Sequence, residues 1–186
     1  MRRGSSLFRG DRLKSTYYSF IFICIIALFS SCASDKSYTG GKLITGPAAA
    51  DIVNYINQGL IAIAELEKKS LESYASVTGE NATTDKKLFE TLRNFVVPTY
   101  KRFVTGLKNI PIKNQEIRQV HAIYISAAES MLDGFQTIMI GSEKSDITVI
   151  KQGNKKLEEG RAGIDKWSAG LNELCKKHGV AFSKDK

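Results

Sequence analysis

The sequence predicts an all-α domain, an antiparallel up-down-up-down four-helix bundle, in residues 47–179. Apolar and small residues recur at intervals of three and four along four long segments, the period of helices that pack at shallow angles. Short polar connections between the segments favour antiparallel neighbours. No stretch alternates in the way typical of a strand. A sensor-like bundle dimer, or two helical hairpins, would show the same pattern.

The first segment begins at Pro47, a residue favoured in the first turn of a helix, and ends near Val77, before Gly79. The period places the following residues on its inner face: Ile52, Ile56, Gly59, Ile63, Leu66, Ser70, Ser73 and Val77.

The second segment follows Thr84 or Asp85 as N-cap and ends near Asn109. Pro98 is expected to kink it near Asn94, because proline removes a backbone donor. The expected inner face consists of Leu88, Leu92, Phe95, Thr99, Phe103, Gly106 and Leu107.

The third segment begins after Pro111 with Asn114 as its N-cap, and the fourth extends from near Asp146 to Gly179, a good C-terminal cap. The third is expected to bury Ile117, Val120, Tyr124, Ala127, Met131, Gly134, Phe135 and Ile138. The fourth carries on its periodic face Ile150, Gly153, Leu157, Gly160, Ile164, Trp167, Leu171, Leu174 and His178.

The N-terminal residues have the pattern of a secretory signal. Basic residues precede an apolar run at positions 20–29, and small residues follow it. The residues Phe29-Ser30-Ser31-Cys32 resemble the lipobox of bacterial lipoproteins, with phenylalanine where that family prefers leucine. The resemblance implies a signal peptide at 1–31, cleavage between Ser31 and Cys32, and diacylglycerol (with palmitate-type acyl chains) on the Cys32 thiol. An uncleaved anchor helix over residues 15–34 is the other interpretation.

Residues 32–46 are expected to be the lipidated cysteine and a flexible tether, since they are rich in Ser, Gly, Thr and Lys without periodicity. Residues 180–186 form a C-terminal tail. The resemblance implies a cell-envelope location. Ala33 and Ser34 lack the aspartate that favours inner-membrane retention, which implies the outer membrane (periplasmic side or surface) in a Gram-negative organism.

The net charge of the chain and its distribution limit the classes of binding partner that we expect. The whole chain carries a net charge of +8, but five of its 27 basic residues fall within the first 14 positions. A secreted domain with a mild, scattered charge and no recognised motif is not expected to bind nucleic acid. The second segment is basic beside an acidic first segment, which favours their pairing. Its basic face is either a solvated surface or a contact for an envelope protein or an anionic surface.

No catalytic set is evident, so the sequence predicts neither an enzyme nor a resident metal or cofactor. His121 lies at the edge of an apolar face, where a hydrogen-bonded histidine is commoner than a haem or metal ligand. Cys175 and His178 supply only two of the three or four ligands that a metal needs. Cys175 is expected to be buried, and His178 is favoured by the dipole of the last helical turn.

Glycine inside helices is unusual because each one costs about 0.8–1 kcal/mol relative to alanine. Gly153 and Gly160 are one heptad apart in the fourth segment. They either let helices approach closely, which is the preferred interpretation, or leave a groove for an apolar ligand. Residues 111–175, with His121, Asp146 and these glycines, are also similar to a pattern of helical-bundle lipoproteins, a resemblance that implies no activity.

The function expected from the sequence is that of a membrane-anchored envelope lipoprotein with a non-catalytic binding or structural role. The alternative is a ligand-binding or sensor-like bundle for a small apolar or haem-like molecule. Residues that would contact such a ligand or a partner are His121, Gly153, Gly160 and Trp167.

Overall fold

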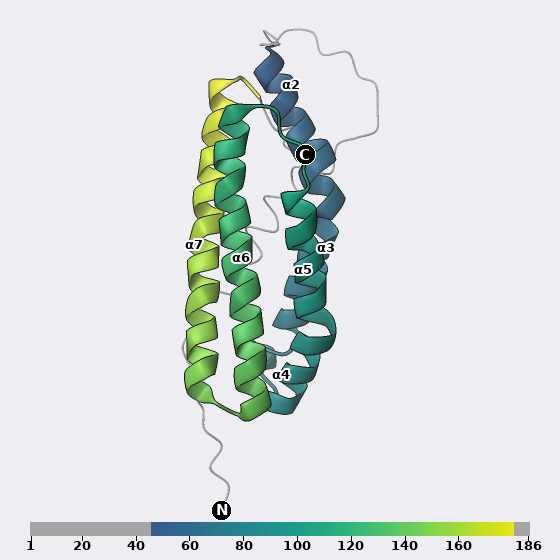
Figure 1. Ribbon diagram of the computed structural model, residues 1–186, viewed down its shortest axis with the longest axis vertical. Coiled ribbons are helices and arrows are strands. Elements are labelled where there is room, and N and C mark those ends of the chain that lie inside the picture. The colour runs from purple at the N-terminus through teal and green to yellow at the C-terminus, as the bar shows by residue number, and fades with distance from the viewer. Residues whose placement is uncertain (1–45, 181–186) are drawn as a thin grey trace, which may run out of the picture.

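The computed structural model describes residues 46–180, which form four long helices joined by short connections, and no strand occurs there (Figure 1). The all-α prediction is therefore confirmed. The predicted signal peptide, Cys32 and most of the tether lie outside the described residues, as does the tail beyond Val180. None of the described helices is long and apolar enough to cross a membrane.

The first two helices each contain a π-helical turn. The first helix consists of α2 (Pro47–Asn54), η1 (Tyr55–Leu60) and α3 (Ile61–Ala75), which follow one another without a break. A 3₁₀ turn, η2 (Gly79–Asn81), leads to the second helix, which consists of α4 (Asp85–Thr91), η3 (Leu92–Val96) and α5 (Val97–Lys108). The turns η1 and η3 are π-helical.

The third and fourth helices are regular and long. They are α6 (Gln115–Lys144) and α7 (Ile147–Lys177). The predicted caps are confirmed: Asn114 Oδ1 accepts hydrogen bonds from two backbone N–H groups of α6, and Asp146 Oδ1 does the same for α7. Thr84 Oγ1 accepts a hydrogen bond from the Lys87 N–H at the start of α4. Gly179 follows α7 with a φ of 67°, the left-handed conformation of a helix C-cap.

Figure 1 shows α6 and α7 side by side along their length, with α3 and α5 on the other side of the molecule. The second helix contacts both α3 and α6, and α2 also contacts α7. Apolar side chains from all four helices meet in a single buried core. Its largest fully buried members are Tyr100, Phe103 and Phe135.

The π-helical turns shift the buried register by one residue. Each adds a residue to one turn, so the inner face of the second helix continues through Val96 and Tyr100, both fully buried. The sequence period placed Phe95 and Thr99 there instead. That prediction is wrong for Phe95, which is 61% exposed. Pro98, which offers no N–H to the carbonyl of Asn94, gives a physical reason for the wide turn at η3.

Helices α6 and α7 approach closely because glycines line their contact. A Cβ atom added to Gly153 would lie 2.6 Å from Ile138 Cγ1 and 2.9 Å from the Gly134 carbonyl oxygen. One added to Gly160 would lie 2.5 Å from Met131 Cγ. Such distances leave no room for a side chain, so they agree with close packing rather than a groove at these two glycines.

Candidate functional site

A chain of hydrogen bonds crosses the core and connects all four helices. The indole Nε1–H of Trp167 in α7 donates to the hydroxyl oxygen of Tyr55 in η1, at 3.3 Å. The Tyr55 hydroxyl lies 3.1 Å from Nδ1 of His121 in α6. Nε2 of His121 lies 3.1 Å from the carbonyl oxygen of Leu107, near the end of α5. Each of the four helices therefore contributes one group to the chain.

The groups at the two ends of this series of hydrogen bonds determine which atom donates and which accepts at each link. A carbonyl oxygen only accepts, so Nε2 of His121 carries the proton that is donated to Leu107. In the neutral ring Nδ1 is then an acceptor, and the Tyr55 hydroxyl donates to it. The Tyr55 oxygen in turn accepts from Trp167, which can only donate. Every link is satisfied when His121 is neutral, and a proton on Nδ1 would displace the Tyr55 donor.

A buried carboxyl lies close to this chain. The Tyr124 hydroxyl in α6 donates to Oε2 of Glu67 in α3 at 2.8 Å, and Glu67 is only 8% exposed. The Tyr124 ring stacks on the Trp167 indole, with centroids 4.0 Å apart and planes inclined by 17°. It also makes an edge contact with Phe103. The aromatic rings thus connect the Glu67 carboxyl to the hydrogen-bonded chain through Trp167.

Burial sets the protonation of these groups. It raises the pKa of Glu67 to about 7, with the Tyr124 hydrogen bond acting in the opposite direction. It lowers the pKa of His121, and the hydrogen bond to Leu107 opposes this in part. Burial also raises the pKa values of Tyr55 and Tyr124, so both hydroxyls keep their protons near neutrality. The site therefore holds a neutral imidazole at His121 and, at Glu67, a carboxyl that titrates near neutral pH.

The structure brings together two of the four residues predicted to contact a ligand or partner. His121 and Trp167 meet through the Tyr55 hydroxyl. His121 is 6% exposed, so it belongs to the core rather than to its edge. Gly153 and Gly160 are not part of this cluster, because they lie at the α6–α7 contact. Ser31 and Cys32 lie outside the described residues.

Sequence reasoning missed Tyr55 and Glu67. A regular α-helical period points Ile56 and Leu66 inward and does not include Tyr55 or Glu67 on that face. The π-helical turn η1 shifts the face so that Leu60 is buried in the place expected for Gly59, and Glu67 in the place expected for Leu66. The one available signal was the position of Tyr55, three residues after the buried Ile52.

Cys175 and His178 are separate from the buried cluster. Cys175 is 2% exposed, as predicted, and burial raises the pKa of its thiol. Nε2 of His178 lies 2.7 Å from Oε2 of Glu116 at the start of α6. Hydrogen bonds from Lys177 and His178 lower the pKa of Glu116. The two residues therefore have different environments and do not form a joint site.

Within residues 46–180 no group of three or more His, Cys, Asp or Glu side chains is arranged to hold a metal ion. Both ring nitrogens of His121 are engaged in hydrogen bonds, so a haem or metal bound there would have to displace Tyr55 or Leu107. The arrangement can hold a proton on Glu67 and keep four helices in register.

Comparison with protein-family models, with curated proteins and with solved structures gave no match to this chain.

Proposed function

We propose that this chain is a lipid-anchored protein of the bacterial cell envelope with a non-catalytic binding or structural role. The observation that carries the proposal is the order of features at the N-terminus: basic residues, an apolar run and the tetrapeptide ending in Cys32. Acyl chains on Cys32 would hold the protein at a membrane, since each buried CH₂ contributes about 0.8 kcal/mol.

The helical domain would follow the anchor at a short distance. Pro47 begins the first helix, so the residues after Cys32 that precede it would act as the tether. In this proposal the four helices form the up-down-up-down antiparallel bundle. The α6–α7 contacts support that arrangement, because Gly141 meets Ile150 whereas Gly170 meets Val120, so residue numbers run in opposite directions.

The buried cluster suits a structural role better than a reactive one. Tyr55, His121 and Trp167 use their polar atoms on one another and on the Leu107 carbonyl. Hydrogen-bonded buried networks of this kind specify a single packing. Binding would then use exposed residues of the protein. The basic second helix is a candidate contact for an envelope protein or for an anionic surface.

The lipid anchor is tested by fatty-acid labelling in a bacterial host, with mass analysis of the mature N-terminus. We expect label on the wild type, none on Cys32→Ala, and a chain that starts at Cys32. The matched control is Cys24→Ala, which removes a cysteine from the apolar run and should leave labelling intact. An unlabelled wild type with an intact N-terminus would mean an anchor helix and would overturn the proposal.

The second candidate is a bundle that binds a small apolar or haem-like molecule. The link between His121 and Trp167 inside the core is the observation that favours it. A visible absorption spectrum and the native mass of the purified protein test it. Absorption in the haem region, or added mass that His121→Phe removes, would favour this candidate. A bare polypeptide mass would contradict it for a tightly bound ligand.

A further inference from the structure

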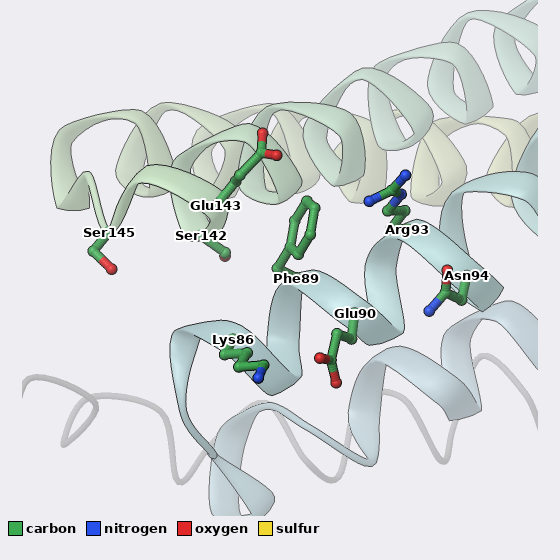
Figure 2. Close-up of a pocket in the computed structure, with 8 residues that line it drawn as sticks. All are labelled: Lys86, Phe89, Glu90, Arg93, Asn94, Ser142, Glu143 and Ser145. Carbon is green, nitrogen blue, oxygen red and sulfur yellow. The ribbon is translucent and has the colours of Figure 1, made fainter.

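A pocket of about 390 Å³ lies between the second helix and the C-terminal end of α6 (Figure 2). Its lining includes Lys86, Phe89, Glu90 and Arg93 on one wall and Ser142 and Glu143 on the other. Figure 1 places this end of α6, beside α4, opposite the end of the molecule where α2 begins at Pro47. Under the proposed function it would be the end farther from the anchor.

The pocket carries two positive and two negative side chains. Lys86 and Arg93 supply the positive charges, and Glu90 and Glu143 supply the negative ones. Within residues 46–180 none of the four forms an ion pair with another residue. The Arg93 guanidinium lies 5.7 Å from the centre of the Phe89 ring. The ring thus stands beside charges that are not neutralised by one another.

A buried hydroxyl at the pocket has no partner in this part of the chain. Ser142 is 3% exposed, and its Oγ makes no hydrogen bond with any described residue. Figure 2 shows this side chain leaving α6 on the side that faces Phe89 and Lys86. A buried hydroxyl without a hydrogen-bond partner destabilises the folded protein. A ligand oxygen placed next to it, after a small movement of the neighbouring side chains, would remove that destabilisation.

We propose that this pocket binds a zwitterionic amino acid or short peptide, whose carboxylate is held by the basic side chains and the Ser142 hydroxyl and whose ammonium group is held by Glu90 or Glu143. The inference rests on the proposed binding role and names its ligand class. The lining carries charges of both signs, so a simple anion or a simple cation would match only part of it. A ligand with one charge of each sign matches the pocket, and the Phe89 ring offers an apolar wall to its body.

Isothermal titration of the full-length chain in detergent micelles with alanine and alanyl-alanine tests this inference. The comparison ligand is N-acetyl-alanyl-alanine amide, which has the same body without either charge. We expect at least one of the two zwitterions to bind and the blocked peptide not to bind. Arg93→Gln and Glu143→Gln should each weaken binding by about tenfold, the effect of losing one charge-assisted contact worth about 1.4 kcal/mol.

Two further variants make the result specific to the pocket. Ser142→Ala should weaken binding without lowering the melting temperature, because it removes an unsatisfied hydroxyl. Arg102→Gln removes an exposed positive charge from α5, outside the pocket, and should leave affinity unchanged. Absence of binding by both zwitterions, equal binding of the blocked peptide, or equal loss in Arg102→Gln would each overturn the inference. None of these outcomes alters the labelling result at Cys32, so the two proposals fail independently.

Discussion

The Tyr55 hydroxyl lies 3.1 Å from Nδ1 of His121, although 66 residues separate them in the chain. Their rings also meet edge to face, with centroids 5.5 Å apart. Because Nε2 of His121 is already committed to Leu107, Tyr55 is the donor in this pair. The contact joins the π-helical turn of the first helix to the N-terminal part of the third.

Removing the Tyr55 hydroxyl should destabilise the protein through the partners that it leaves behind. Tyr55→Phe leaves Trp167 Nε1 and His121 Nδ1 without their hydrogen bonds, and we expect a loss of about 1–3 kcal/mol in the free energy of unfolding. His121→Phe should cost a similar amount. The double variant should lose less free energy of unfolding than the two single variants lose together. We expect a coupling energy of about 1 kcal/mol, measured by urea denaturation.

The control for this double-mutant cycle combines Tyr55→Phe with Ile150→Val, a substitution at a distant site. Ile150 packs against Gly141 near the start of α7, far along that helix from Trp167. These two effects should add within about 0.5 kcal/mol. Strict additivity of Tyr55→Phe and His121→Phe as well would contradict the hydrogen bond between them.

Glu67 should make stability fall as pH rises. Its pKa is about 7 in the folded protein, above the ordinary value of 4.5, so the folded state holds a proton that the unfolded state has released. Stability therefore declines between about pH 4.5 and 7 and is flat above that window, with a total change on the order of 3 kcal/mol. Glu67→Gln keeps an acceptor for Tyr124 and cannot ionise. It should be more stable than the wild type at pH 8 and similar at pH 4.5.

Trp167 offers an independent readout, since it stacks on the tyrosine that donates to Glu67 and is the only tryptophan in the chain. Its fluorescence should titrate near pH 7 in the wild type and not in Glu67→Gln. Glu72→Gln, which removes an exposed carboxyl from the same helix, is the matched control. If Glu67→Gln leaves the pH dependence of stability unchanged, that dependence does not arise from Glu67.

His121 should act in the opposite direction with pH. Its pKa is lowered by burial, so below the ordinary value of 6.5 the unfolded state gains a proton before the folded state does. This contribution is fully present above pH 6.5 and is lost as pH falls toward the folded pKa. In a Glu67→Gln background, stability should therefore fall on acidification from pH 6.5, and adding His121→Phe should reduce that fall. An unchanged acid limb would contradict the prediction.

The third and fourth helices followed the sequence period closely, and the first two did so less well. In α6 and α7 the apolar spacing predicts residues that are indeed buried, such as Met131 and Leu157, since a regular α-helix keeps its register. A π-helical turn leaves no simple periodic mark, so the inward shift to Val96 and Glu67 was not foreseen. The hydrogen-bonded chain was half predictable: His121 and Trp167 were singled out as candidate contact residues, whereas Tyr55 was not assigned to the inner face of the first segment.

Cys175 should be almost inert to a thiol reagent while the protein is folded. It is 2% exposed, and burial raises the pKa of its thiol, so both access and thiolate population are low. In a chain with Cys24→Ser and Cys32→Ser, we expect the reaction with dithionitrobenzoate to be at least a hundredfold slower in buffer than in urea. Adding Ser126→Cys, at an exposed position on α6, should restore fast labelling of one thiol. Fast reaction of Cys175 in the folded chain would contradict its burial.

Glycines at the α6–α7 contact should differ sharply in their tolerance of alanine. A Cβ at Gly153 would lie 2.8 Å from the Ile138 backbone nitrogen, and one at Gly160 would lie 2.9 Å from the Ala127 carbonyl oxygen. Because backbone atoms cannot move aside without shifting a helix, Gly153→Ala and Gly160→Ala should destabilise by about 1–3 kcal/mol despite their gain in helix propensity.

Gly170 provides the matched control in the same helix. A Cβ there would meet only the Val120 side chain, at 3.3 Å, which small adjustments can accommodate. Gly170→Ala should therefore be neutral or stabilise by up to about 1 kcal/mol, since alanine is the better helix former. Thermal and urea denaturation of the three variants measure the difference. Equal tolerance at all three positions would mean that the two helices do not approach as closely as Gly153 and Gly160 require, and the groove interpretation of these glycines would then be preferred.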